Sequence, residues 1–139
     1  PNFSGGLAVY RAGAFYGYIG RTGEIAIPAA FQRARPFAEG VAAVSSSGRW
    51  GYIDRNGKFV IPPKFGQANS FSGGLASVRV RGKWGYIDPT GKVVISAKYD
   101  SAEAFDDGLA EVTIYNDTKR TIQRGYINQN GKFVYSWRQ

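Results

Sequence analysis

Apolar and polar positions alternate with a period of two in several short segments of the chain. In residues 76–81, which read Ala-Ser-Val-Arg-Val-Arg, every second residue is apolar. This alternation predicts a strand with one buried face. A second strand is expected from Trp84 to Asp88, and a third, rich in β-branched residues, from Lys92 to Ile95. No segment has amphipathic helical periodicity over ten residues or more, so the pattern predicts an all-β fold.

The residues between these strands have the chemistry of tight turns. Arg81-Gly82-Lys83 predicts a hairpin between the first two strands. Asp88-Pro89-Thr90-Gly91 predicts a type I turn, in which the Asp carboxylate accepts backbone N–H groups and Gly91 adopts a positive φ. The three strands are therefore expected to form an antiparallel meander.

The meander recurs along the chain. A period of 34 residues separates equivalent glycines, namely Gly6, Gly40, Gly74 and Gly108. Fixed spacing over tens of residues is typical of a repeat array. We therefore expect one domain, residues 1–139, made of four repeat units: 3–36, 37–70, 71–104 and 105–139. The last unit carries six extra residues near Tyr115–Arg120, which predict a protruding hairpin.

A lone three-stranded sheet is marginally stable in water, so each unit is expected to bury its aromatic side chains against the next. An open, solenoid-like row is favoured over a closed, propeller-like arrangement, because the two terminal units diverge in sequence as capping units do. The glycine after the aromatic, such as Gly85, is expected to let a ring or a neighbouring backbone lie directly on the strand.

The connectors between meanders are also patterned. Phe65, Ala68 and Phe71 are spaced by three, and the same spacing holds in the connectors of the first and third units. This spacing predicts one helical or 3₁₀ turn that folds the aromatic side chains back onto the sheet. Pro62 is expected to end the preceding strand, because proline removes a donor from the ladder.

The segment Trp84-Gly85-Tyr86-Ile87-Asp88-x-x-Gly91-Lys92 recurs from Trp50, and in altered form from Tyr16 and from Arg124. With this motif and spacing, the chain resembles the bacterial WG-repeat family over essentially its whole length. The resemblance implies a repeat scaffold that is often part of larger surface or secreted proteins, without a common enzymatic activity. Tyr16 and Arg124 depart from the motif and leave the aromatic role at both ends in question.

Aromatic-rich hairpins with Gly-Lys turns are also similar to choline-binding cell-wall repeats, although those repeats are much shorter than 34 residues. This second resemblance implies glycan or cell-wall binding.

Charge is distributed unevenly. The formal net charge is +8; residues 1–92 hold 12 Lys and Arg against 4 Asp and Glu, whereas residues 93–139 hold 6 against 6. A basic half can face an acidic partner or a polyanion. The chain contains no Met, so it is expected to be a piece of a larger protein. No apolar run approaches membrane-spanning length, and no membrane insertion is expected.

The residue types argue against catalysis. The chain has no His and no Cys, so imidazole bases, thiolate nucleophiles and the usual zinc ligands are missing. Asp54 and Asp88 are interpreted as turn formers, and the carboxylates of Glu103, Asp106 and Asp107 as a solvated loop. We therefore expect no enzyme activity, no metal site and no cofactor.

Residues that break the repeat are the best candidates for a binding surface, because a constant scaffold carries its specificity in variable positions. The candidate partner-binding residues are Arg33, Arg35, Arg79, Arg81, Lys83, Tyr115, Lys119 and Arg120. Three repeat aromatics, Tyr16, Trp50 and Trp84, are candidates for stacking on a ligand, but a core role is favoured for them.

Three functions follow from these observations. The first is a non-catalytic scaffold that binds a protein partner. The second is a glycan or cell-wall binding module that uses exposed Tyr16, Trp50 and Trp84. The third is binding of a polyanion or nucleic acid through the basic N-terminal half. The compartment is not determined by the sequence, although the family resemblance favours a bacterial surface or secreted location.

Overall fold

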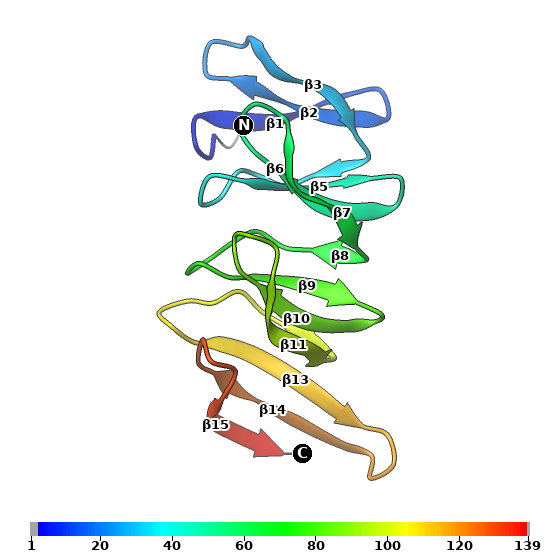
Figure 1. Cartoon of the computed structure of the whole chain (residues 1–139), viewed down its shortest axis with the longest axis vertical. Helices are drawn as coiled ribbons and strands as arrows, with labels where there is room; N and C mark the ends of the chain where they lie inside the picture. The colour runs from blue at the N-terminus through cyan, green and yellow to red at the C-terminus, as the bar shows by residue number, and fades with distance from the viewer. Residues whose placement is uncertain (1–2, 139) are drawn as a thin grey trace. The chain divides into compact units, whose positions relative to one another are not determined.

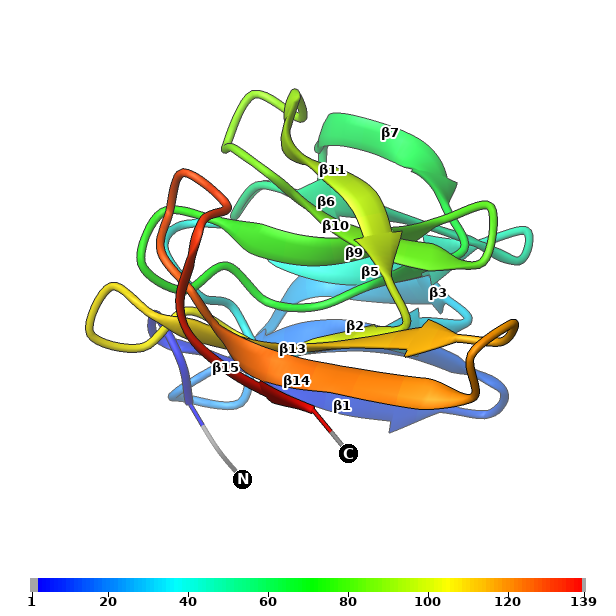
Figure 2. The same cartoon turned by 90° about the horizontal axis from the view of Figure 1, so that it is seen from below.

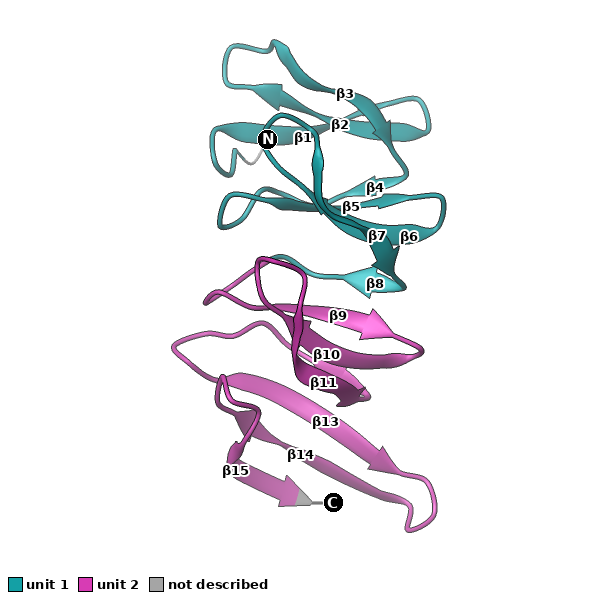
Figure 3. Ribbon diagram, in the orientation of Figure 1, with its two compact units in different colours: residues 1–70 teal, residues 71–139 magenta. Residues whose placement is uncertain are grey.

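The computed structural model describes residues 3–138, with side chains through Trp137. The chain divides into two compact units, residues 1–70 and 71–139 (Figure 3). The boundary falls where the sequence places the junction between the second and third repeats. That the whole chain is one domain stays a prediction.

Unit 1 contains two antiparallel sheets (Figure 1). The first has the order β1-β2-β3 and consists of β1 (Leu7–Ala12), β2 (Phe15–Gly20) and β3 (Ile25–Phe31). The second has the order β4-β5-β6-β7 and consists of β4 (Arg33–Ala34), β5 (Ala42–Ser46), β6 (Arg49–Ile53) and β7 (Phe59–Phe65). The short strand β8 (Gln67–Ala68) lies at the end of this unit.

Unit 2 repeats this plan. Its first meander consists of β9 (Ala76–Val80), β10 (Lys83–Ile87) and β11 (Val93–Tyr99), paired antiparallel in that order. Its second sheet has the order β12-β13-β14-β15, with β12 (Ser101–Ala102), β13 (Ala110–Asn116), β14 (Thr121–Ile127) and β15 (Phe133–Arg138). The β13–β14 hairpin forms the expected long arm (Figures 1 and 2).

The prediction of an all-β fold built from three-stranded antiparallel meanders is confirmed. Within residues 3–138 all regular structure is strand, and no sheet closes into a barrel. The predicted hairpin turn is also confirmed, since Arg81 and Gly82 both have positive φ, 52° and 82°, as a type I′ turn requires.

The Asp turn forms as its chemistry predicts. The Asp88 carboxylate accepts the backbone N–H groups of Thr90 and Lys92 at 2.9 and 3.1 Å, and Gly91 has a φ of 89°. Asp54 and Asn128 accept the equivalent backbone bonds in their own repeats. These side chains are turn formers in all three repeats.

Each unit has its own apolar core, shared by its two meanders. In unit 1, buried residues of the first meander, among them Tyr18 and Phe31, pack with Val44 and Ile53 of the second. In unit 2, Tyr86 and Tyr99 pack in the same way with residues of the following meander, including Val112. A single meander thus buries its aromatic side chains against its neighbour, as expected from the marginal stability of a lone three-stranded sheet.

The prediction of a helical or 3₁₀ turn in the connectors is wrong. Arg33 and Ala34 pair as β4 with Ser45 and Val44 of β5, and Ser101 and Ala102 pair as β12 with β13. The connector is therefore an added edge strand of the next meander. The spacing of three that suggested a helical turn belongs to an extended, bent segment, whose backbone groups are satisfied by the ladder instead of by a local turn.

The third strands are longer than predicted. The segment expected to end at Ile95 continues as β11 to Tyr99, and Pro62 lies inside β7 rather than at its end. The reason is a bulge: Tyr52 pairs with Ile61 but Trp50 pairs with Phe65, so β7 carries two extra residues opposite Gly51. Prolines are tolerated in such a bulge because the ladder needs no donor there.

The bulge explains why glycine follows the aromatic. A Cβ placed on Gly51 would lie 2.6 Å from the Ile61 carbonyl oxygen, and one on Gly85 would lie 2.6 Å from that of Ile95. The neighbouring backbone therefore occupies the space that a side chain would need. Of the two possibilities that the sequence left open, a ring or a backbone, it is the backbone that lies on this glycine.

Candidate functional site

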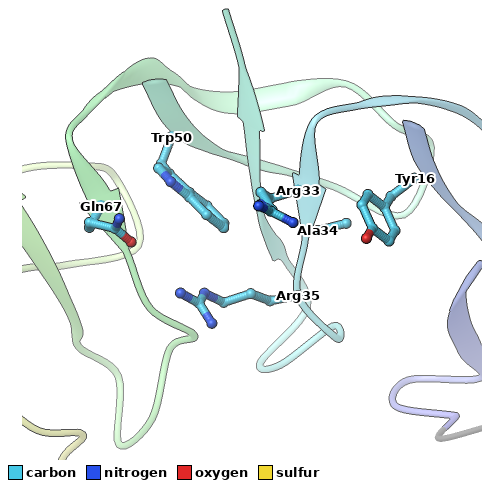
Figure 4. A pocket seen from close by; sticks show the side chains of 6 residues that line it. All are labelled: Tyr16, Arg33, Ala34, Arg35, Trp50 and Gln67. Atoms are coloured by element: carbon cyan, nitrogen blue, oxygen red, sulfur yellow. The ribbon is translucent and has the colours of Figure 1, made fainter. Parts of the chain in front are cut away.

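Two adjoining hollows open on the surface of unit 1. One, of about 400 Å³, is lined by Tyr16, Arg33, Ala34, Arg35, Trp50 and Gln67 (Figure 4). The other, of about 410 Å³, is lined by Arg11, Ala14, Tyr16, Gln32, Arg33 and Ser45. Because Tyr16 and Arg33 line both hollows, the two form one continuous surface, which we call the arginine face.

Strand pairing brings the residues of the arginine face together. Arg11 of β1 lies directly across from Tyr16 of β2. Ser45 of β5 lies between Arg33 of β4 on one side and Trp50 of β6 on the other. The connector, as an added edge strand, therefore places Arg33 between the equivalent aromatics of two successive repeats.

Arg35 covers Trp50. Its guanidinium carbon lies 4.9 Å from the centre of the Trp50 ring, and its Nε donates a hydrogen bond of 2.9 Å to the carbonyl of Ala68. Only 8% of the Trp50 surface is exposed. The cation is thus fixed in a cation–π contact, and the ring has little surface left for a ligand.

A hydrogen bond from Tyr18 fixes the backbone of Arg35. The Tyr18 hydroxyl donates a hydrogen bond of 2.6 Å to the Arg35 carbonyl, and the Tyr18 ring packs edge-on against Phe37 at 4.8 Å. Burial raises the pKa of the Tyr18 hydroxyl well above its ordinary value, so the hydroxyl remains a donor at every physiological pH. Tyr18 therefore positions the connector that carries both Arg33 and Arg35.

The two remaining arginines of the face are exposed. The Arg11 guanidinium lies 5.9 Å from the centre of the Tyr16 ring and donates from Nε to the carbonyl of Gly13 at 2.8 Å. Arg33 has no hydrogen-bond or ion-pair partner for its guanidinium among residues 3–138. The face therefore presents one fully available guanidinium beside a partly engaged one.

The carboxylates of unit 1 lie at the opposite ends of the strands. The unit has three, at Glu24, Glu39 and Asp54. Asp54 follows Ile53 at the far end of β6, and the backbone carbonyl of Glu24 accepts the Gly20 N–H at the far end of β2. Glu39 lies in the loop before β5, whose first residue Ala42 pairs with Ile53. No carboxylate lines either hollow.

The other residues predicted as partner-binding lie in unit 2. Arg79, Arg81 and Lys83 are exposed on the β9–β10 hairpin, and Tyr115, Lys119 and Arg120 are exposed on the β13–β14 arm. Among them, Lys83 is engaged, because its Nζ lies 2.5 Å from a carboxylate oxygen of Asp100. Trp84 is half-buried, as is Tyr16. Whether any of these residues binds a partner stays a prediction.

Asp100 joins the two hairpins of unit 2. Its second carboxylate oxygen accepts the backbone N–H of Tyr115 at 2.6 Å. Partial burial works to raise the pKa of Asp100, but the hydrogen bonds from Lys83 and from the Tyr115 N–H outweigh it and hold that pKa below its ordinary value. The carboxylate is therefore ionised and neutralised within unit 2.

Sequence reasoning missed Arg11 and Gln32, which line the hollows beside the predicted Arg33 and Arg35. Arg11 could have been found, because counting outward from the β1–β2 turn places it opposite Tyr16. Gln32 could not, because its position depends on the connector pairing as a strand. Gln67 occupies the variable connector position equivalent to Arg33 and can be recognised from the repeat.

No helix in the described part of the chain is long and apolar enough to span a membrane. Among the same residues, no group of three or more acidic side chains could hold a metal ion.

The comparison with known proteins agrees with the repeat seen in the structure. No curated protein matches the chain. A family model described as "WG containing repeat" matches three times in tandem, at residues 16–50, 50–84 and 84–116. Each match begins in the second strand of a meander. The first two matches run to the second strand of the next meander and the third ends with β13, so each spans one complete connector. Since these matches cover well over half of the chain, and the Gly, Tyr and Asp of the motif have the structural roles described above, the chain is a repeat-containing module that belongs to the WG-repeat family.

Proposed function

We propose that this module is non-catalytic and binds a protein partner through the arginine face of unit 1. The proposal is carried by one observation: the residues that break the repeat in unit 1, Arg33 and Arg35, line a continuous hollowed surface together with Arg11, Tyr16 and Gln67. A surface with exposed arginine and half-buried aromatic side chains has the composition typical of protein interfaces.

We base the proposed absence of enzyme activity on the residue types of the chain and of the arginine face. The WG-repeat family is not a known enzyme family. The arginine face contains no carboxylate, and the chain has no His and no Cys, so the face offers no carboxylate or imidazole base and no thiol nucleophile.

A sugar-stacking role is less well supported. Stacking of a sugar or a nucleobase needs an open aromatic ring, whereas Trp50 is 8% exposed and carries Arg35 over its ring. Tyr16 is half-buried and has Arg11 near its ring. These contacts favour the protein-binding proposal over the glycan and nucleic-acid alternatives.

Site-specific photo-crosslinking tests the proposal. A benzoylphenylalanine at Gln67, an exposed residue of the hollow, is expected to give discrete adducts in extracts of the source cells. The matched control carries the same group at Thr90, an exposed turn residue of unit 2. Adducts from Gln67 in which mass spectrometry finds a second polypeptide, and that nuclease and glycosidase leave intact, support the proposal. Equal adducts at both positions, or adducts that nuclease or glycosidase removes, contradict it.

A further inference from the structure

We propose that the arginine face binds an extended acidic segment of the partner protein, with Arg33 and Arg11 pairing with its carboxylates. This inference names the chemistry of the partner and rests on the proposed function.

The arginine face carries positive charge that no neighbouring carboxylate compensates. Arg33 is exposed and has no hydrogen-bond or ion-pair partner for its guanidinium among the described residues, and Arg35 adds a second cation whose position is fixed over Trp50. Arg11 is exposed and uses only Nε, in its bond to Gly13, which leaves its two terminal nitrogens as donors. A guanidinium fork of this kind matches a carboxylate in bidentate geometry.

Within unit 1, carboxylates lie far along the strands from the arginine face. Along β6, four residue steps separate Trp50, at the face, from Asp54. Four steps of an extended strand span about 13 Å. That exceeds the Debye length of about 8 Å at physiological ionic strength, so Asp54 is largely screened from the face. Glu24 lies as far along the neighbouring sheet, because it bonds to Gly20, four steps from Tyr16.

The shape and the uncharged lining of the arginine face also fit an extended peptide. Two hollows in series, sharing Arg33, suit an extended segment better than a single small anion. Gln32 uses its Oε1 to accept the Gly48 N–H at 2.7 Å, and its amide NH₂ group remains as a donor. Gln67 is exposed at the other end. Amide side chains at both ends can bond to the backbone of an extended peptide, while its alternate side chains, about 7 Å apart, reach the arginines.

The covered ring of Trp50 favours an acidic peptide over a nucleic acid as the ligand. Both ligands carry negative charge, but binding of single strands depends on open aromatic rings on which bases stack. Trp50, under Arg35, does not provide one. Carboxylate pairing needs only the guanidinium groups.

Fluorescence anisotropy with the whole 139-residue chain tests the inference. The probe is a labelled ten-residue peptide of alternating Glu and Ser, with a Gln–Ser peptide and a ten-residue thymidine oligonucleotide as comparison ligands. We expect the acidic peptide to bind, the Gln–Ser peptide to bind at least tenfold more weakly, and the affinity of the acidic peptide to fall as salt is raised.

Two charge reversals give a matched pair of variants within unit 1. Arg33→Glu should weaken binding of the acidic peptide by about tenfold or more, because it removes a charge-assisted pair and adds repulsion. Lys58→Glu makes the same change in net charge at an exposed residue beyond Asp54 and should change affinity less than twofold. Neither side chain contributes to the core, so circular dichroism should show that both variants fold.

Each outcome decides a different claim. Equal loss in Arg33→Glu and Lys58→Glu, or no binding of the acidic peptide, overturns the acidic-segment inference. Binding of the Gln–Ser peptide at the same face overturns the inference but leaves the proposed function standing. Preference for the oligonucleotide over both peptides, lost in Arg33→Glu, overturns both.

Discussion

The two units share a scaffold but differ at the positions that form the arginine face. Counting 68 residues forward, Arg33 and Arg35 of unit 1 correspond to Ser101 and Glu103 of unit 2. The Trp50 position is taken in unit 2 by Arg124, since the extra residues of the last repeat intervene. A basic surface in one unit thus becomes a surface of mixed charge in the other, where Asp100 pairs with Lys83.

What stays the same in both units is what holds the connector. Tyr18 donates to the Arg35 carbonyl and Tyr86 to the Glu103 carbonyl, both at 2.6 Å. The bond is to the backbone, so the side chain at that position can change from Arg to Glu without losing it. This separation of backbone support from side-chain identity is what lets one scaffold carry two different surfaces.

The largest expected effect tests the shared scaffold. Gly51→Ala in unit 1 and Gly85→Ala in unit 2 each force a Cβ against a carbonyl oxygen at 2.6 Å, and each should lower the free energy of unfolding by about 3 kcal/mol. Gly48→Ala, where the new methyl meets nothing within 4 Å but φ is 80°, should cost only about 1 kcal/mol. Urea unfolding measures all three. A small effect in only one of the two units would show that the bulge is not a common feature.

The next effect tests the tyrosine bonds. Tyr18→Phe and Tyr86→Phe each leave a connector carbonyl without its donor and should each cost about 1 to 2 kcal/mol. Tyr126, the equivalent residue of the last repeat, is 37% exposed, and Tyr126→Phe should change stability by less than about 0.5 kcal/mol. Thermal unfolding of the three variants compares them. If Tyr126→Phe loses as much stability as the other two variants, the hydrogen bond to the connector carbonyl does not explain their loss.

A third substitution should stabilise unit 2. The Tyr99 hydroxyl is buried and has no hydrogen-bond partner among the described residues, whereas unit 1 has Phe31 and Phe65 at the equivalent positions. Tyr99→Phe removes a buried polar group without a partner and should raise the free energy of unfolding by about 1 kcal/mol. Denaturant unfolding measures the gain. A loss of stability would mean that this hydroxyl has a partner, such as a bound water.

The smallest expected effect is a difference between the two units in how their stability depends on pH. Gln32 in unit 1 and Asp100 in unit 2 are equivalent, and each accepts a backbone N–H of its neighbouring hairpin. Because the pKa of Asp100 is lowered by folding, its contribution is present above its unfolded pKa of about 3.9 and is lost as pH falls through the folded pKa. For this partly exposed pair we expect about 0.5 kcal/mol. Asp100→Asn should therefore destabilise at pH 7 and have no effect near pH 2; the same loss at both values would assign the effect to packing.

Much of the scaffold could be predicted from the sequence because its determinants are local. The alternation of apolar and polar residues predicts the strands. The residues of the Asp88 turn and of the Arg81–Gly82 hairpin specify their own backbone conformations. The connectors could not be predicted in this way. The spacing of Phe31, Ala34 and Phe37 fits both a helical turn and a bent strand, and the pairing of β4 with β5 decides between them.

The candidate site was predicted only in part for the same reason. Arg33 and Arg35 could be chosen because they differ from their equivalents in other repeats. That they lie beside Arg11, and that Arg35 covers Trp50, depends on cross-strand pairing and on side-chain conformation. Neither is encoded in a local pattern.

The central claim is that equivalent positions on a common scaffold have acquired different surfaces, and that only the surface of unit 1 accepts an acidic segment. An NMR titration of the ¹⁵N-labelled chain with the Glu–Ser peptide tests it most directly. The account predicts that backbone amide shifts at Arg11, Tyr16, Arg33 and Gln67 change and saturate together while those of Ser101 and Glu103 do not move. Shifts of equal size in both units, or shifts centred on Ser101 and Glu103, would contradict it.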